Sequence, residues 1–393
     1  MNICEKNTAP GEGRGLDFLT GFWKEKYLQE YIPAGGSKLK FVTGRPGSGK
    51  TFFLNSICRI ARQENYRTVS FSARDIWLHD FKELYAEIFR QCDILPCLEG
   101  CSKRVIENMG YRPQDIPDGM SFMDYLSQIG MGDAITKREL RTQLKLLFLD
   151  NPVLDNNFAL ACSMLTGAIL GHPVLERQNQ ELLLSWLSGD RTVKLALLRA
   201  FGMSPSRITK YNARHMLRSL AEIVHLGGFS GLFVAVDDLE ILLNRSADSE
   251  LHYTKVKRED TYESIRQMVD DIDNMNHIMF VFAFDRALID DEKCGVKSYQ
   301  ALWMRIQNEV TGQRFNRFSD IVDLDRLAVQ EYGVEELIHL SEQLCRELTA
   351  QTPWQPHALT PEQAAAILSQ SKTSAVGIPG LVRTTLTGGN SHV

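Results

Sequence analysis

The sequence predicts an α/β fold in which a parallel β-sheet, covered by helices on both faces, carries a phosphate-binding loop. Three observations predict it. Continuous apolar runs recur along the chain, as in strands that are buried on both faces. Segments with helical periodicity separate these runs. The first run is followed directly by the glycine-rich stretch GRPGSGKT at 44–51 and then by an apolar helix.

Composition limits the classes of protein that fit. The 393 residues suffice for one large domain or two ordinary ones, and 44% hydrophobic with 24% charged residues excludes a mostly disordered chain. Lys and Arg number 44 against 49 Asp and Glu, so the net charge of −5 excludes a protein that is basic overall. The N-terminus lacks the apolar core of a signal peptide, no apolar stretch is long enough to span a bilayer, and eight cysteines are few for a disulfide scaffold. We therefore expect a cytoplasmic protein with reduced thiols and no membrane contact.

The expected elements follow in a clear order. A helix at 16–31 precedes the first strand, and further helices are predicted at 51–62 and 77–92. Apolar runs predict five strands, at 38–43, 66–71, 231–236, 277–284 and 320–324. We divide the chain into an N-terminal lead-in and helix, a first part of the core, a helical insertion, a second part of the core and a C-terminal helical lid, with bounds 1–37, 38–93, 94–228, 229–330 and 331–393.

The loop at 44–51 fits G-x-x-x-x-G-K-[ST] at every fixed position. Its glycines let backbone N–H groups turn toward a phosphate, and the following helix directs its positive end to the same anion. Lys50 is expected to reach the β- and γ-phosphates, and the Thr51 hydroxyl to ligate Mg²⁺. The sequence thus predicts an ATP site with Mg²⁺, whose contacts come from Gly44, Arg45, Pro46, Gly47, Ser48, Gly49, Lys50, Thr51 and Phe52.

A buried strand that ends in carboxylates supplies the second half of such a site. Asp237 is expected to hold Mg²⁺ through water. Asp238 stands where many such ATPases have the Glu that orients the attacking water, and Glu240 could take over if the strand bends. Three outcomes stay open: activation of water by Asp238, activation by Glu240, or weak hydrolysis. The alternative is a purely structural role, in which Asp238 caps the following helix.

Later polar residues extend the site. Asp285 ends the fourth strand, where a polar residue often senses the γ-phosphate; a carboxylate would repel phosphate, so it could instead pair with Arg286. Arg305, Arg314 and Arg317 precede the fifth strand, and one of them could act in a neighbouring subunit's site, which predicts a homo-oligomer. Arg383, at the start of the last helix, is expected to touch the phosphates from the same chain.

Asp237 lies 187 positions after Lys50 (237 − 50), so a large helical segment separates the two halves of the core. Within it, 191–221 carries seven Lys and Arg and no Asp or Glu. Four of these cations are spaced 3, 4 and 4, which predicts a single helical face: Arg207, Lys210, Arg214 and Arg218. We interpret it as a contact surface for the phosphate backbone of double-stranded DNA. An acidic protein partner or a solvated face would explain the same charges.

With these pieces placed, the chain resembles the ATP-binding P-loop proteins of BREX and related bacterial anti-phage defence loci, distant relatives of the origin-recognition-like AAA+ ATPases. The resemblance lies in KFVTGRPGSGKTFFL (40–54), LLLSWLSGD (182–190), the 216–246 segment with VAVDDLE, TYESIRQMVDDID (261–273) and the 281–306 segment. It implies a bacterial cytoplasmic ATPase with an AAA+-like P-loop core that works beside a helicase, nuclease or DNA-modification enzyme. By position, Lys50, Thr51, Asp237 and Asp238 are the nucleotide site. Asp238 departs from the family's usual Glu, and Phe284-Asp285 from a small residue and a Thr.

Two functions fit this sequence best. The first is an oligomeric ATPase that uses ATP to act on DNA within a defence complex. The second is a nucleotide-gated scaffold or switch that hydrolyses little and recruits a partner protein. A small-molecule or nucleotide kinase is disfavoured by the large insertion and the late arginines.

Overall fold

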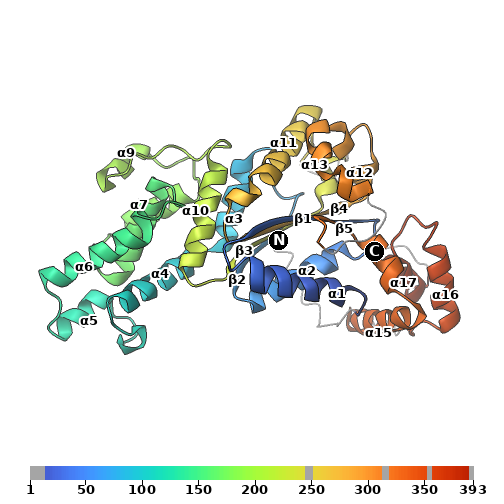
Figure 1. Cartoon of the computed structure of the whole chain (residues 1–393), viewed down its shortest axis with the longest axis horizontal. Coiled ribbons are helices and arrows are strands. Elements are labelled where there is room, and N and C mark those ends of the chain that lie inside the picture. Colours follow the sequence, from blue (N-terminus) through green and yellow to red (C-terminus); the bar gives the residue numbers. More distant parts are fainter. Residues whose placement is uncertain (1–13, 244–250, 312–317, 352–355, 389–393) are drawn as a thin grey trace.

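A computed structural model describes residues 14–243, 251–311, 318–351 and 356–388. In this part of the chain the fold is mixed α/β, with one five-stranded parallel sheet and many helices (Figure 1). The strand order is β2-β3-β4-β1-β5. All five strands lie where the sequence predicts them: β1 Ser37–Gly44, β2 Tyr66–Ser72, β3 Gly231–Asp237, β4 Ile278–Asp285 and β5 Ile321–Asp323.

The register of the sheet brings distant polar residues together. Gly44 at the end of β1 pairs with Asp285 at the end of β4. Asp237 at the end of β3 pairs with Ser72, and Asp323 of β5 lies opposite Thr43. Because parallel strands place their carboxyl ends at one edge, these residues share the edge at which α/β sheets bind ligands.

Helices cover both faces of the sheet, as the continuous apolar strands require. One face, with Val42, Phe233 and Val281, packs on α1 (Arg14–Trp23), a π-helical segment (Lys24–Tyr31) and α2 (Lys50–Gln63). On the other face α3, α10 and α13 contact the strands, while α4 packs on α10 and α11 packs on α13. The bounds of these helices are Phe81–Cys92 for α3, Ile94–Asn108 for α4, Ala213–Leu226 for α10, Lys255–Asp271 for α11 and Gln300–Thr311 for α13. The predicted helix at 77–92 begins four residues later, because the Asp80 side chain caps α3 by accepting from the Lys82 N–H.

The segment between β2 and β3 forms helices and no strand, and it projects to one end of the molecule (Figure 1). Beyond α4 it consists of α5 (Phe122–Gln128), α6 (Ala134–Leu144), α7 (Asn156–Leu170), α8 (Arg177–Leu187) and the short α9 (Leu195–Leu198), with a π-helical turn at Lys145–Leu149 after α6. Its apolar side chains join the same core cluster as the sheet. The α4–α10 contact is very close, since a Cβ on Gly100 would lie 1.9 Å from the Gly227 carbonyl oxygen.

The C-terminal helices lie at the opposite end of the molecule (Figure 1). They have their own small apolar cluster, which includes Leu337, Ile367 and Val382. Their bounds are Val334–Gln351 for α15, Pro361–Gln370 for α16 and Ile378–Leu386 for α17. Two shorter helices, α12 (Ala287–Asp290) and α14 (Leu324–Glu331), follow β4 and β5.

Candidate nucleotide site

The loop between β1 and α2 offers its backbone to an anion. Gly47 and Gly49 have φ values of +74° and +91°, which glycine adopts without the strain that a Cβ brings. The helix α2 begins at Lys50, so its first N–H groups and its positive dipole end point into the loop. Gly47, Gly49, Lys50 and Thr51 line a cavity of about 370 Å³. A nucleotide phosphate fits this lining.

Lys50 is held by acceptors of its own chain. Its Nζ forms an ion pair with Asp285 and donates to the carbonyl oxygens of Gly44 at 3.3 Å and Arg45 at 3.2 Å. Asp285 therefore pairs with the loop lysine, and the predicted pairing with Arg286 is wrong. Arg286 pairs instead with Asp323 at the end of β5. A phosphate that binds Lys50 has to compete with the Asp285 carboxylate.

Thr51 and Asp237 meet as magnesium ligands would. The Thr51 hydroxyl donates to Asp237 Oδ2 at 2.6 Å. Asp237 is 3% exposed, and burial raises the pKa of its carboxyl group despite the Thr51 hydrogen bond. A hydroxyl and a carboxylate beside a phosphate cradle are the hard oxygen donors that Mg²⁺ takes. These two residues fit the ion that the sequence predicts.

Asp238 and Glu240 share Arg74, which lies 3.7 Å from Glu240 Oε1, but their other partners differ. Asp238 has a φ of +59°, accepts a hydrogen bond from the Ser72 hydroxyl at 2.6 Å and lies 3.5 Å from Arg74. Its carboxylate is thus drawn toward β2. Glu240 instead accepts a hydrogen bond at 3.1 Å from the backbone N–H of Asp285, the residue whose side chain pairs with Lys50. Burial raises the pKa of Glu240, and the neighbouring Asp285 adds to the rise. Of the two carboxylates, Glu240 is the one bonded to the residue that pairs with Lys50.

The rest of the cavity is mostly apolar, with Gln343 and Arg383 as polar members, and is built from both ends of the described chain. Leu16 of α1 and Phe52 of α2 form one side. The other side comes from the C-terminal helices, and its residues are Tyr332, Leu340, Gln343, Leu344, Pro379, Gly380 and Arg383. A flat, partly apolar ring such as a nucleobase suits these walls.

A family model described as BREX system ATP-binding protein BrxC/D matches residues 25–378, most of the chain. The chain belongs to this family. The predicted resemblance is confirmed, and with it ATP binding in phage defence. No curated protein and no solved structure matches the chain significantly. None of the helices in the described part of this BREX ATP-binding family member is long and apolar enough to cross a membrane.

The arginines predicted for the ATP site of this family member have different positions. Arg383 on α17 reaches the cavity beside Lys50 and Thr51. Arg305 on α13 forms a two-point ion pair with Asp270 of α11, with N–O distances of 2.5 and 2.8 Å. It also donates to the Ala301 carbonyl at 2.7 Å. Its guanidinium is thus engaged within the chain. Arg314 and Arg317 lie outside the described residues.

The predicted single helical face for DNA is wrong in part. Arg214 and Arg218 lie on α10, but Arg207 and Lys210 lie in the loop before it. Side chains bond the carbonyl groups of this loop, which favours a non-helical backbone: Trp186 donates to the Ser206 oxygen at 3.1 Å and Asn212 to the Arg207 oxygen at 3.1 Å.

Exposure also divides the four cations. Arg207 and Lys210 are exposed. Arg214 is half-buried, 3.5 Å from Asp271 and over the Phe81 ring. The Nε of Arg218 is buried without a hydrogen-bond partner among the described residues. Only the first two are therefore well placed to meet a large anion.

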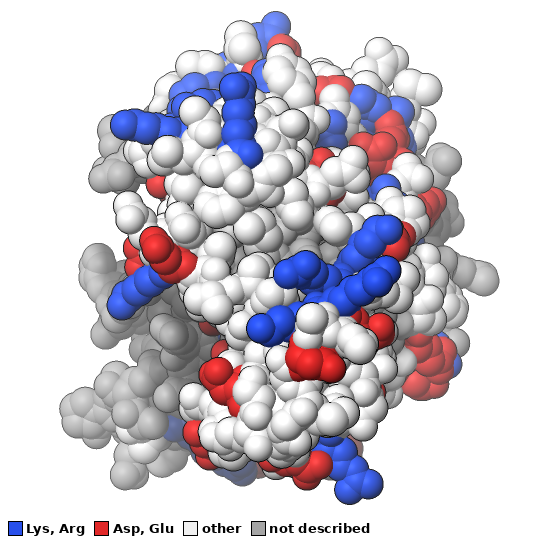
Figure 2. Space-filling model, turned by 90° about the vertical axis from the view of Figure 1, so that its left-hand side faces the viewer, with Lys and Arg blue, Asp and Glu red and all other residues white. Residues whose placement is uncertain are grey.

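Sequence reasoning missed two features. Lys137, Arg138, Arg141 and Lys145 are all exposed along α6 and the turn after it. Figure 2 looks at the end that carries α6 and α9, and Lys and Arg gather there in two groups with an uncharged strip between them. The spacing of 4 between Lys137, Arg141 and Lys145 was the signal for the first feature. The second is Asp325, which contacts the phosphate loop and belongs to no motif.

Proposed function

We propose that the chain is an AAA+-like ATPase that binds and slowly hydrolyses ATP with Mg²⁺, forms homo-oligomers, and acts on or with double-stranded DNA in a cytoplasmic BREX complex. One observation carries the proposal. Lys50, Thr51, Asp237 and Glu240 converge at one edge of a parallel sheet, beside a cavity that suits a nucleotide. The further partner would be a helicase, nuclease or modification enzyme of the same locus.

Each residue has a defined part in hydrolysis. Lys50 binds the β- and γ-phosphate oxygens. Thr51 and Asp237 would hold Mg²⁺, which would supply positive charge beside the phosphates. Glu240 orients a water and accepts its proton while the water oxygen bonds to the γ-phosphorus. The bond to the bridging oxygen breaks, and ADP and phosphate leave. Because burial raises the pKa of Glu240, this carboxylate is a better proton acceptor than an ordinary surface carboxylate.

The strand order supports the AAA+-like assignment. β4 lies between β1, which leads into the phosphate loop, and β3, which ends in Asp237. The residue that ends β4 therefore lies between the lysine and the magnesium-binding carboxylate, where this class places its phosphate sensor. Here that residue is Asp285, in contact with Lys50.

Asp285 also favours the second candidate, a nucleotide-gated scaffold with little hydrolysis. A carboxylate beside the terminal phosphate repels it and competes for Lys50. Such a site would bind ATP, turn it over slowly and pass the bound state to a partner.

The DNA proposal rests on exposed cations in the insertion. Arg207 and Lys210 are joined by the exposed Arg191, Lys194 and Arg199. Positive side chains in such a group bind phosphates and release counterions, so the binding is expected to weaken steeply with salt.

ATP turnover with and without double-stranded DNA tests these functions, with oligomeric mass measured in parallel. Lys50→Ala is expected to lower turnover at least ~100-fold, and Glu240→Gln to keep ATP binding but lower turnover by a similar factor. Lys26→Ala serves as the control, because this half-buried side chain lies in the π-helical segment, outside the cavity lining, and pairs with its neighbours Glu25 and Glu30. ATP-dependent assembly without turnover would replace the ATPase by the switch, and no ATP binding would contradict both.

A further inference from the structure

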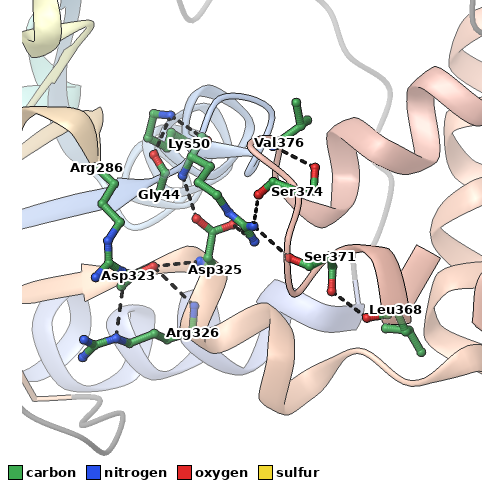
Figure 3. A network of polar contacts seen from close by, with 11 residues as sticks. Gly44, Lys50, Arg286, Asp323, Asp325, Arg326, Leu368, Ser371, Ser374 and Val376 are labelled. Atoms are coloured by element: carbon green, nitrogen blue, oxygen red, sulfur yellow. Dashed lines mark hydrogen bonds and ion pairs between the residues drawn. The ribbon is translucent and has the colours of Figure 1, made fainter. Parts of the chain in front are cut away.

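Arg45, the second residue of the phosphate loop, ties this loop to the C-terminal helices. Figure 3 labels its partners Asp325, Ser371 and Ser374. Its guanidinium donates to the carbonyl oxygens of Ser371 at 2.8 Å and Ser374 at 2.6 Å, at the end of α16. It also pairs with Asp325 Oδ1 at 3.2 Å. The Arg45 backbone N–H donates to the other oxygen of Asp325 at 2.6 Å. One side chain thus joins α14, α16 and the loop.

Backbone contacts form a second part of this junction. The Gly377 N–H donates to the Pro46 carbonyl at 2.9 Å, and the Gly380 N–H donates to the Gly47 carbonyl at 2.8 Å. The approach needs glycine, because a Cβ on Gly377 would lie 2.6 Å from Ser48 Cα. Arg45, Pro46 and Gly47 are therefore all bonded, on the outer side of the loop, to the α16–α17 segment.

Asp325 is 8% exposed and lies in the first turn of α14. Asp323, the residue that caps α14, accepts from the Asp325 N–H at 3.0 Å and pairs with Arg286. Arg286 follows Asp285, the partner of Lys50. Covalent and polar contacts therefore run without a gap from Lys50 through the end of β4 to α14, Arg45 and the C-terminal helices. Figure 3 shows the part of this path at Arg286, Asp323 and Asp325.

We propose that Arg45 and Asp325 are positioning residues that set the shape of the phosphate loop and make α16 and α17 respond to nucleotide. The proposal rests on ATP binding at this loop, as proposed above. A phosphate that takes Lys50 away from Asp285 and from the Arg45 carbonyl changes the loop. The loop cannot shift without moving Ser371, Ser374 and Gly377, because its outer groups are bonded to that segment. Neither residue needs to touch the reacting atoms.

The test compares Arg45→Ala, Asp325→Asn and the charge-preserving Arg45→Lys in the full chain. Readouts are the affinity for a fluorescent ATP analogue, kcat against KM for ATP, and hydrogen exchange of the α16–α17 amides with and without ATP. Lys372→Ala is the matched control, since it removes an exposed positive charge from the α16–α17 segment.

Arg45→Ala and Asp325→Asn are expected to weaken ATP binding and raise KM by about tenfold, with kcat within about threefold, and to remove the ATP-dependent protection of α16–α17. Arg45→Lys is expected to restore part of both effects, because it keeps the charge but not the planar fork.

Wild-type affinity and protection in both variants would overturn the proposal, while loss of binding in Lys50→Ala would still support the proposed function. A lower melting temperature with the ATP-dependent protection intact would assign Arg45 a purely structural role and likewise overturn it. A wild-type protein that binds no ATP would overturn the proposed function and this proposal together.

Discussion

The phosphate-loop end and the helical insertion hold their charged side chains in different ways. At the loop, Lys50, Arg45 and Asp237 each have a specific partner, and these partners come from β4, α14 and α2. In the insertion, Arg207 and Lys210 are exposed, and the segment is fixed to the core mainly by apolar packing. Charge at the loop is organised for a small ligand in a defined pose, whereas charge in the insertion suits a large, irregular anion.

This contrast predicts that packing changes damage the insertion most. Gly100→Ala in α4 is expected to cost about 3 kcal/mol of unfolding free energy, since the new Cβ would lie 1.9 Å from the backbone oxygen of Gly227 and neither helix can move easily. Urea denaturation measures the loss. ATP affinity of the folded fraction is expected to stay unchanged.

Gly21→Ala is the matched control, because no atom lies within 4 Å of the added Cβ on α1. There the expected change is a small stabilisation, below ~1 kcal/mol. Equal stability of Gly100→Ala and wild type would contradict the close α4–α10 packing.

The same contrast explains how far the sequence could predict the molecule. Strands and the phosphate loop depend on local patterns, so β1 and β3 lie at the predicted residues, and Lys50 and Thr51 lie at the predicted cavity. Asp325 lies 280 positions from Arg45 and no local pattern marks it. Contacts of this kind depend on the strand order, which places β5 next to β1 and which the sequence alone does not specify.

The prediction of a single helical face from Arg207 to Arg218 is wrong for a related reason. The spacing of cations from Arg207 to Arg218 has helical periodicity, but carbonyl groups before Asn212 are bonded by Trp186 and Asn212 side chains. Periodicity predicts a helix only where the backbone is left to bond with itself.

A charge series sharpens this side of the comparison. Reversal of Arg207 and Lys210 to Glu is expected to lower affinity for double-stranded DNA about tenfold at low salt and to reduce the salt dependence, because both side chains are exposed. Arg214→Ala is expected to change affinity less than threefold and instead to lower stability by about 1 kcal/mol, since it loses Phe81 and Asp271. Fluorescence anisotropy at two salt concentrations measures the affinities.

The paired change Lys137→Glu with Arg141→Glu tests the second basic group on α6. If this variant loses more affinity for double-stranded DNA than the variant at Arg207 and Lys210, the DNA surface lies on α6. Unchanged affinity in both double variants would show that neither group binds the DNA backbone.

The smallest expected effect concerns pH and the α11–α13 layer. Hydrogen bonds from Arg266, with Tyr299 and Gln267, lower the pKa of Glu263 from its usual 4.5 to about 2. A carboxylate whose pKa is lower in the folded state stabilises the fold above its unfolded pKa and loses that contribution as pH falls toward the folded value. The stability difference between wild type and Glu263→Gln should therefore be constant near pH 7 and shrink between about pH 4.5 and 2. The group is one-third exposed, so solvent screening keeps the difference small.

Melting temperatures of wild type and Glu263→Gln across this pH range measure the difference, and Glu107→Gln, an exposed change on α4, is the control. A difference that does not vary with pH would mean that the ion pair with Arg266 contributes nothing and that α11 is held by its apolar contacts with the sheet, as the insertion is.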